Sequence, residues 1–294
     1  MRELIEKIES GEFAITVELE PPKGVNTNKV VQYAGLLNKK VDAINITDCP
    51  MANLRMSPIA IAHIIRTQAN LDAIFHLTCR DRNVIGLQSE LLGAAALGVK
   101  NILILTGDPP SVGDHPQAAG IFEVDSVGLV NIANTLKKGY DLSGNPLNEA
   151  PKFYIGVAAN PCAKDMEREM EKLIEKIEKG ANFIQTQPVF DMEAMESFLR
   201  KVKPYDIPVI AGILPLKSYK MTRHIIDNIP GIEIPNWTVK RMEEGGRTEG
   251  VKMSMEILSQ LRNMAHGAHI MPVGDARIVL EILEEEEKQL GFAL

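Results

Sequence analysis

The chain has 294 residues, of which 45% are hydrophobic and 24% are charged, a composition typical of globular proteins and not of disordered ones. Its 39 acidic and 32 basic residues give a net charge of −7, which excludes a strongly basic nucleic-acid-binding surface as the main feature. The longest apolar stretch, residues 91–99, is too short for a membrane span, and the charged N-terminus is unlike a signal peptide. We therefore expect a cytoplasmic protein without a membrane span.

Short apolar, often β-branched runs alternate with amphipathic stretches along the whole chain. The runs predict strands at Ala14–Leu19, Ala43–Thr47, Ala73–Leu77, Asn101–Leu105, Tyr154–Ala158, Phe183–Thr186, Val209–Ile213 and His269–Met271. A helix is predicted after each strand, near Asn28–Lys39, Ser57–Ala69, Asn83–Leu97, Ser126–Lys138, Lys164–Lys179, Met192–Val202, Ser218–Asn228 and Ala276–Leu290. Eight strand–helix units with nearly continuous apolar strands predict one (β/α)8 TIM barrel over residues 1–294.

Two segments interrupt the repeat. Residues 230–266 precede the eighth strand and predict two extra helices, Asn236–Glu244 and Thr248–Met264. The stretch Thr106–Asp125 is rich in glycine and proline and predicts a long loop, which is more often functional than a mere connection.

Polar residues gather where the predicted strands end, the place where barrels of this kind carry their reacting groups. The most specific strand-end motifs are Glu18-Leu-Glu-Pro-Pro22, His76-Leu-Thr-Cys79, Leu105-Thr-Gly-Asp-Pro-Pro110, Gly180-Ala-Asn182 through Gln187, and Ala211-Gly-Ile-Leu-Pro215. In this order they resemble the methylenetetrahydrofolate reductase family, in its short bacterial form without a C-terminal regulatory domain. The resemblance implies a flavin-dependent oxidoreductase of one-carbon metabolism and methionine biosynthesis that interconverts 5,10-methylenetetrahydrofolate and 5-methyltetrahydrofolate.

The resemblance assigns catalytic roles to three residues. Glu18 matches the general acid that protonates N10 of the folate, a task favoured by a pKa raised toward neutral in a dry surrounding. Glu20, two residues along the same strand direction, is the competing acid. Asp108 matches the carboxylate beside the flavin pyrimidine and the pterin, and Gln187 matches the amide that hydrogen-bonds the pterin.

The resemblance also predicts a cofactor site. Thr47, His76, Gly107, Asp108 and Ala158 match flavin contacts. Glu169 and Lys176, seven residues apart on one helix, match the groups that hold the ribityl chain and the phosphate.

The flavin tail is where this sequence departs from the family pattern. Thr106 replaces an arginine found in many relatives, and the segment after Asn160-Pro161 is shorter than in relatives that hold FAD. FMN is therefore an alternative to FAD. A plain FMN barrel would instead seat the phosphate near Gly212 and Gly274.

The sequence supports only general predictions about the electron donor, the oligomeric state and metal binding. The electron donor is either NAD(P)H or a partner subunit, and the chain is expected to form oligomers. The three cysteines, Cys49, Cys79 and Cys162, give no disulfide framework and no close-spaced ligand pair, so no metal is expected. Two other functions remain: a catalytically silent barrel subunit of an electron-transfer complex, and a flavin-free pterin methyltransferase.

Overall fold

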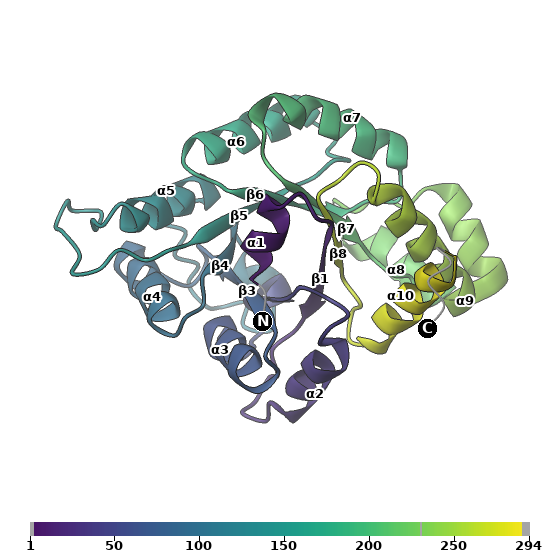
Figure 1. The fold of residues 1–294 in the computed structure, drawn as a ribbon, viewed down its shortest axis with the longest axis horizontal. Coiled ribbons are helices and arrows are strands. Elements are labelled where there is room, and N and C mark those ends of the chain that lie inside the picture. Colours follow the sequence, from purple (N-terminus) through teal and green to yellow (C-terminus); the bar gives the residue numbers. More distant parts are fainter. Residues whose placement is uncertain (1–2, 230, 290–294) are drawn as a thin grey trace.

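The computed structural model describes residues 3–229 and 231–289, and within them eight parallel strands close into a barrel (Figure 1). The strands are β1 (Ala14–Leu19), β2 (Ala43–Ile46), β3 (Asp72–Thr78), β4 (Asn101–Leu105), β5 (Tyr154–Ala159), β6 (Phe183–Pro188), β7 (Val209–Ile213) and β8 (Gly267–Ile270). Each strand pairs with the next, and β8 returns to β1 with Thr16 opposite His269. The predicted barrel is confirmed, and every strand end lies within two residues of its predicted position.

A helix follows each strand and covers the outside of the barrel. These helices are α2 (Asn28–Leu37), α3 (Pro58–Gln68), α4 (Val84–Ala96), α5 (Ser126–Lys137), α6 (Met166–Glu178), α7 (Met192–Val202), α8 (Tyr219–Asn228) and α10 (Arg277–Gln289). The last residue predicted for the final helix, Leu290, lies outside the described residues. Helix α6 shows why they form: Asp165 caps the first turn by accepting from the Arg168 amide, and Leu173 on the apolar face is fully buried.

The insertion before the eighth strand is helical, as predicted. Helix α9 (Asn236–Leu261) is interrupted at Gly246, whose φ of 53° and ψ of −135° no helix contains. The break falls between the two predicted helices. The second half is anchored in the core by Leu258 and Leu261, which are fully buried.

The long loop between β4 and α5 contains only one short 3-10 turn, η2 (Pro110–Val112), between residues 106 and 125. Asp114 holds this loop against its neighbours, because its carboxylate accepts from Lys23 Nζ at 2.6 Å and from the Leu54 amide at 2.9 Å. The loops after β1, β2 and β4 are thereby joined into one wall of the barrel mouth.

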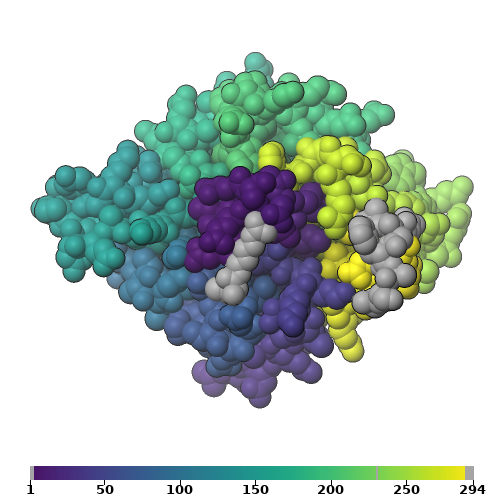
Figure 2. Space-filling model, in the orientation of Figure 1, coloured from purple at the N-terminus to yellow at the C-terminus, as the bar shows by residue number. Residues whose placement is uncertain are grey.

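The amino end of the barrel is closed by a helix that the sequence reading missed, α1 (Leu4–Glu9). Figures 1 and 2 view this end, where α1 lies across the barrel axis. Leu4 and Ile8 are buried against apolar side chains inside the barrel, among them Tyr154 and Phe183. The signal was present, since Leu4 and Ile8 are spaced to lie on one helical face.

Candidate functional site

The inside of the barrel changes from apolar to polar along its axis. Every second residue of a strand points inward, so the inward positions form layers. The layer at the amino end is apolar and consists of Ala14, Ala43, Ile74, Leu103, Tyr154, Phe183 and Ile210, with Leu4 and Ile8 of α1. The next layer is buried and polar, with Thr16, Asn45, His76, Gln185 and His269. Glu18 stands one step closer to the mouth on β1.

The polar layer is connected by hydrogen bonds. The Asn45 amide bridges two histidines, with Oδ1 at 3.0 Å from His76 Nε2 and Nδ2 at 3.2 Å from His269 Nδ1. The Thr16 hydroxyl also lies 2.9 Å from His269 Nδ1. In the arrangement that satisfies this network, Asn45 and Thr16 donate to Nδ1 of His269, so its proton sits on Nε2. That nitrogen faces Glu18, with 3.8 Å between Nε2 and Oε2.

The Glu18 carboxyl is shielded but not sealed from solvent, with 26% of its side chain exposed. Burial raises its pKa, but His269 and, to a smaller extent, His76 favour the ionised carboxylate by more than burial disfavours it, so the pKa lies below its ordinary value. The expected upward shift of the Glu18 pKa is therefore wrong for this structure, chiefly because His269 lies beside the carboxyl. Burial in turn lowers the pKa of His76 to about 4, so His76 is neutral at neutral pH.

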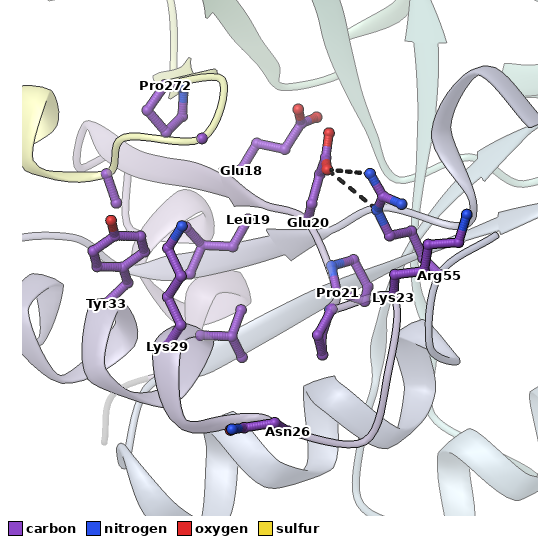
Figure 3. A pocket seen from close by; sticks show the side chains of 14 residues that line it. Glu18, Leu19, Glu20, Pro21, Lys23, Asn26, Lys29, Tyr33, Arg55 and Pro272 are labelled. Atoms are coloured by element: carbon purple, nitrogen blue, oxygen red, sulfur yellow. Dashed lines mark hydrogen bonds and ion pairs between the residues drawn. The ribbon is translucent and has the colours of Figure 1, made fainter. Parts of the chain in front are cut away.

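Glu20, the competing acid, lies outside this network. Its side chain is half exposed and pairs with Arg55, whose Nη2 donates to Oε2 at 3.2 Å. Figure 3 shows Glu18 and Glu20 with the Arg55 guanidinium beside Glu20.

Thr47 lies just beyond β2 and is buried, yet its hydroxyl has no hydrogen-bond partner among the described residues. Its neighbour Asp48, which the sequence reading did not single out, is fully engaged. The Asp48 carboxylate accepts from the amide and hydroxyl of Thr78, at 3.0 and 2.9 Å, and from Arg82 at 2.9 Å. This ion pair fixes the ends of β2 and β3; the Thr-Asp and Cys-Arg-Asp-Arg runs at these ends were the signal for it.

Gly107 follows β4 with a φ of +90°, which favours glycine. A Cβ there would lie 2.9 Å from Thr78 Cβ, so the glycine also permits β3 and β4 to approach at the mouth. Asp108 comes next and is exposed.

Helix α6 is tied to the carboxyl end of β5 by the two residues predicted to hold the flavin tail. Lys176 is buried and its ammonium donates to the Ala158 carbonyl at 3.0 Å. Burial lowers its pKa, although Glu169 opposes that shift. Glu169 Oε1 accepts from the Asn160 amide at 2.8 Å. Both side chains therefore fix the β5 end, whatever else they bind.

Gln187 is exposed at the end of β6, where the register to β7 shifts between Gln185 and Pro188. A Cβ at Gly212 would lie 2.6 Å from the Thr186 carbonyl oxygen, so this close contact requires glycine. The irregularity sets the direction in which the chain leaves β6.

A cavity of about 310 Å³ borders Glu18 (Figure 3). It lies between the end of β1, helix α2 and the loop before α10. Its lining includes apolar Leu19 and Val30 and the cations Lys23, Lys29 and Arg55.

A family model for methylenetetrahydrofolate reductase matches residues 3–287. The chain belongs to the methylenetetrahydrofolate reductase family. The resemblance read from the strand-end motifs is thus confirmed.

Curated relatives carry the same name. Methylenetetrahydrofolate reductase 2 of Schizosaccharomyces pombe is 27% identical, over 96% of this chain and 46% of the relative. The 5,10-methylenetetrahydrofolate reductase of Escherichia coli strain K12 is 24% identical, over 85% of this chain and 82% of the relative. This chain therefore spans less than half the length of the fission-yeast relatives.

Solved structures show the same fold. An uncharacterized protein from Clostridium thermocellum, described as binding two copies of 5-methyl-5,6,7,8-tetrahydrofolic acid, superimposes with a TM-score of 0.67 at 18% identity over 99% of both chains. The EDTA monooxygenase EmoA from Chelativorans sp. BNC1 gives a TM-score of 0.60 at 11% identity over 94% of both chains.

Within the described ranges, no three His, Cys, Asp or Glu side chains are grouped so as to hold a metal ion. Burial raises the pKa of the Cys79 thiol to about 12. In the same part of the chain, every helix is too short or too polar to cross a bilayer.

Proposed function

We propose that this chain interconverts 5,10-methylenetetrahydrofolate and 5-methyltetrahydrofolate with the help of a bound flavin. Family membership and the names of the bacterial relatives support this reaction. The observation that carries the proposal is the Glu18 carboxyl, which stands at the barrel mouth beside His269 and borders a cavity. A titratable group in this position is what proton delivery to a bound folate requires.

The residues at the mouth fit a flavin. The Thr47 hydroxyl and the Gln185 Oε1 atom are buried without hydrogen-bond partners in the described chain, and a heteroaromatic ring edge would supply donors and acceptors for such groups. Gly107, Asp108 and Ala158 lie at the neighbouring strand ends, and His76 lies below them. When bound, the flavin would supply the hydride donor and acceptor at its N5 atom. Glycine and alanine at two of these positions leave the ring room.

Glu18 serves as the general acid toward N10 of the folate in this proposal. In the free chain its pKa lies below the ordinary value, so the carboxylate is ionised at neutral pH. A folate lying over Glu18 would exclude water from the exposed quarter of the side chain, and desolvation raises a carboxyl pKa. Binding therefore shifts Glu18 toward the form that donates a proton. His269 lies beside this carboxyl, with 3.8 Å between its Nε2 and Glu18 Oε2.

Asp108 and Gln187 orient the pterin. Both are exposed at strand ends that open on the mouth, and a carboxylate and an amide match the alternating donors and acceptors of a pterin edge. Asp108 would also disfavour negative charge on a flavin pyrimidine nearby and so lower its potential.

The flavin tail is assigned to Glu169 and Lys176. Lys176 would attract a phosphate, although its ammonium is engaged with the Ala158 carbonyl. FAD and FMN both remain compatible with this assignment, and electrons would come from NAD(P)H or from a partner subunit.

Absorbance spectroscopy of the purified chain under anaerobic conditions tests the proposed function. We expect flavin bands near one equivalent per chain, and bleaching of these bands when 5-methyltetrahydrofolate is added. Bands that do not bleach would identify the silent electron-transfer subunit. Folate binding without any flavin would instead favour the pterin methyltransferase. Reduction by NADH, or only by reduced viologen, then separates the two electron donors.

A further inference from the structure

A second cavity, of about 360 Å³, lies at the amino end of the barrel, at the opposite end of the strands from Glu18. It is bordered by α1, by the last turns of α3 and α5, and by the starts of β3, β4 and β5. Figure 1 views this end of the barrel, with α1 lying across it. The proposed reaction uses none of the residues that line this cavity.

The lining of this cavity is positively charged, although the whole chain carries a net charge of −7. Among the described residues that line it are four cations and two carboxylates, which leaves two positive charges in excess. Both carboxylates are already paired. Asp72 pairs with Arg66, and Glu3 Oε1 accepts from Lys100 Nζ at 2.9 Å.

The excess charge belongs to Lys137 and Lys152, because neither forms an ion pair with a described residue. Lys137 is partly buried, and its ammonium donates to the side-chain oxygen of Asn182 at 3.2 Å. Burial lowers the pKa of this ammonium, and no carboxylate of the described chain opposes the shift. Lys152 is exposed. A partly buried cation without a carboxylate is costly, and a bound anion would remove part of that cost.

We infer that this cavity is a binding site for a phosphate dianion, either free or carried by a small monoester, held by Lys137 and Lys152. The inference does not depend on the proposed function. A phosphate monoester carries a charge of about −1.5 to −2 at neutral pH, which matches the excess of two positive charges. The cavity volume is at the lower end of ligand pockets. A neighbouring hollow of about 620 Å³ shares Lys100, Pro151 and Lys152 with it and offers room for an organic group.

The alternative is a purely structural role for Lys137. Asn182 Oδ1 also accepts from the Ile155 amide at 2.9 Å, so the lysine helps to hold the end of α5 against the starts of β5 and β6. However, one amide oxygen satisfies one of the three ammonium donors and supplies no negative charge. The other donors are available to an anion in the cavity.

Isothermal titration calorimetry of the purified chain tests the inference, in a phosphate-free buffer whose ionic strength is held constant with chloride. The probes are inorganic phosphate, glycerol 3-phosphate and, as the uncharged control, glycerol. Both anions should bind saturably and stabilise the folded chain, whereas glycerol should do neither. Lys137→Gln should weaken both anions about 10-fold, because it removes a charge-assisted hydrogen bond from a partly buried site. Lys152→Gln, at an exposed lysine, should leave folding intact and weaken them about 2- to 5-fold.

Two other lysines provide matched controls. Lys138→Gln removes the same charge from the next residue of the chain, which is exposed and does not line the cavity. Lys176→Gln removes the candidate phosphate contact at the carboxyl end of β5. Both variants should bind the anions within about twofold of the wild type, because chloride screens charges that do not touch the ligand.

The two anions identify the source of the phosphate. Tighter binding of glycerol 3-phosphate supports a monoester, and equal or tighter binding of inorganic phosphate supports the free ion. If Lys137→Gln does not fold, Lys152→Gln decides by the same criterion.

Three results would overturn the inference. The first is the absence of saturable binding of either anion to the wild type. The second is wild-type affinity in the folded Lys137 and Lys152 variants. The third is a loss in Lys176→Gln as large as that in Lys137→Gln, which would move the anion to the carboxyl end of the barrel.

Discussion

The two ends of the barrel are built from the same eight strands but use their inward positions differently. At the amino end the inward side chains are apolar and α1 covers them. The buried carboxylate of Asp72 at this end has hydrogen-bond partners, since it accepts from the Leu4 amide at 3.0 Å and from Asn101 Nδ2 at 2.9 Å. At the carboxyl end Thr47 Oγ1 is buried without a partner among the described residues, and so is Gln185 Oε1 in the polar layer below it.

This difference separates stability from function. A buried polar group without a partner costs about 1–3 kcal/mol, and a bound ligand that supplies the partner would recover this cost. The amino end should therefore respond to mutation as a folding core, and the carboxyl end as a binding site.

The largest expected effect is on chemistry at the carboxyl end. Glu18→Gln should retain flavin and accept electrons from the donor, but lose about 10²- to 10⁴-fold in the folate half-reaction, because the amide has no proton to give. Rapid mixing of reduced protein with methylenetetrahydrofolate measures it. Glu20→Gln is the matched control and should stay near wild type; if the two variants exchange these roles, Glu20 is the acid.

At the amino end the expected effect is on stability. Leu4→Ala should lower the free energy of unfolding by about 2–5 kcal/mol, since it leaves a cavity under the barrel, while activity per folded molecule stays unchanged. Urea denaturation measures this change. Leu36→Ala, at a leucine that is 47% exposed, provides the control and should cost far less. A loss of folate turnover in folded Leu4→Ala would contradict the assignment of stability to the amino end and of function to the carboxyl end.

His76 lies between the two ends and should make stability depend on pH. The unfolded chain binds its proton near pH 6.5, whereas the folded chain does so only near pH 4. Between these two pH values the unfolded state therefore binds more protons than the folded state. Lowering the pH from about 6.5 to about 4 should thus reduce the free energy of unfolding by about 3 kcal/mol, at 1.36 kcal/mol per pKa unit. His76→Gln keeps a hydrogen-bond donor for Asn45 but has no group that titrates in this range. The variant should therefore lose less unfolding free energy than the wild type when unfolding is measured from pH 7 to pH 4. Parallel curves for both proteins would rule out this contribution.

The smallest effect concerns Lys176 at the β5 end. If it meets a flavin phosphate, Lys176→Ala should weaken FMN by about 10- to 150-fold, corresponding to about 1.5–3 kcal/mol, and leave riboflavin nearly unchanged. Fluorescence titration of the apoprotein compares the two. Equal losses would mean that Lys176 acts through the Ala158 carbonyl alone.

Much of the fold could be read from the sequence because it follows periodicity. Strands such as Asn101–Leu105 and Val209–Ile213 are continuous apolar runs, and their ends were predicted to the residue. Helix α1 was missed because its six residues are shorter than the window in which helical spacing is persuasive.

The site was less predictable where it depends on three-dimensional pairing. Glu18, Thr47 and Gln187 stand at strand ends that motifs could mark. The bridge from His76 through Asn45 to His269 joins β3, β2 and β8, which lie far apart in sequence. The sequence feature that could have indicated this bridge is Asn45, a polar residue in an otherwise apolar strand. The direction of the Glu18 pKa could not be read, because it depends on the histidine that the barrel closure brings beside it.

The central claim is that Glu18 becomes a proton donor when folate covers it. Infrared difference spectroscopy of the carboxyl C=O stretch, with Glu18→Gln to assign the band, measures the pKa of Glu18 in the free protein and in the complex with 5-methyltetrahydrofolate. The account predicts a pKa below the ordinary glutamate value in the free protein and a clear rise in the complex. The same pKa in both states, or a fall upon binding, would contradict it.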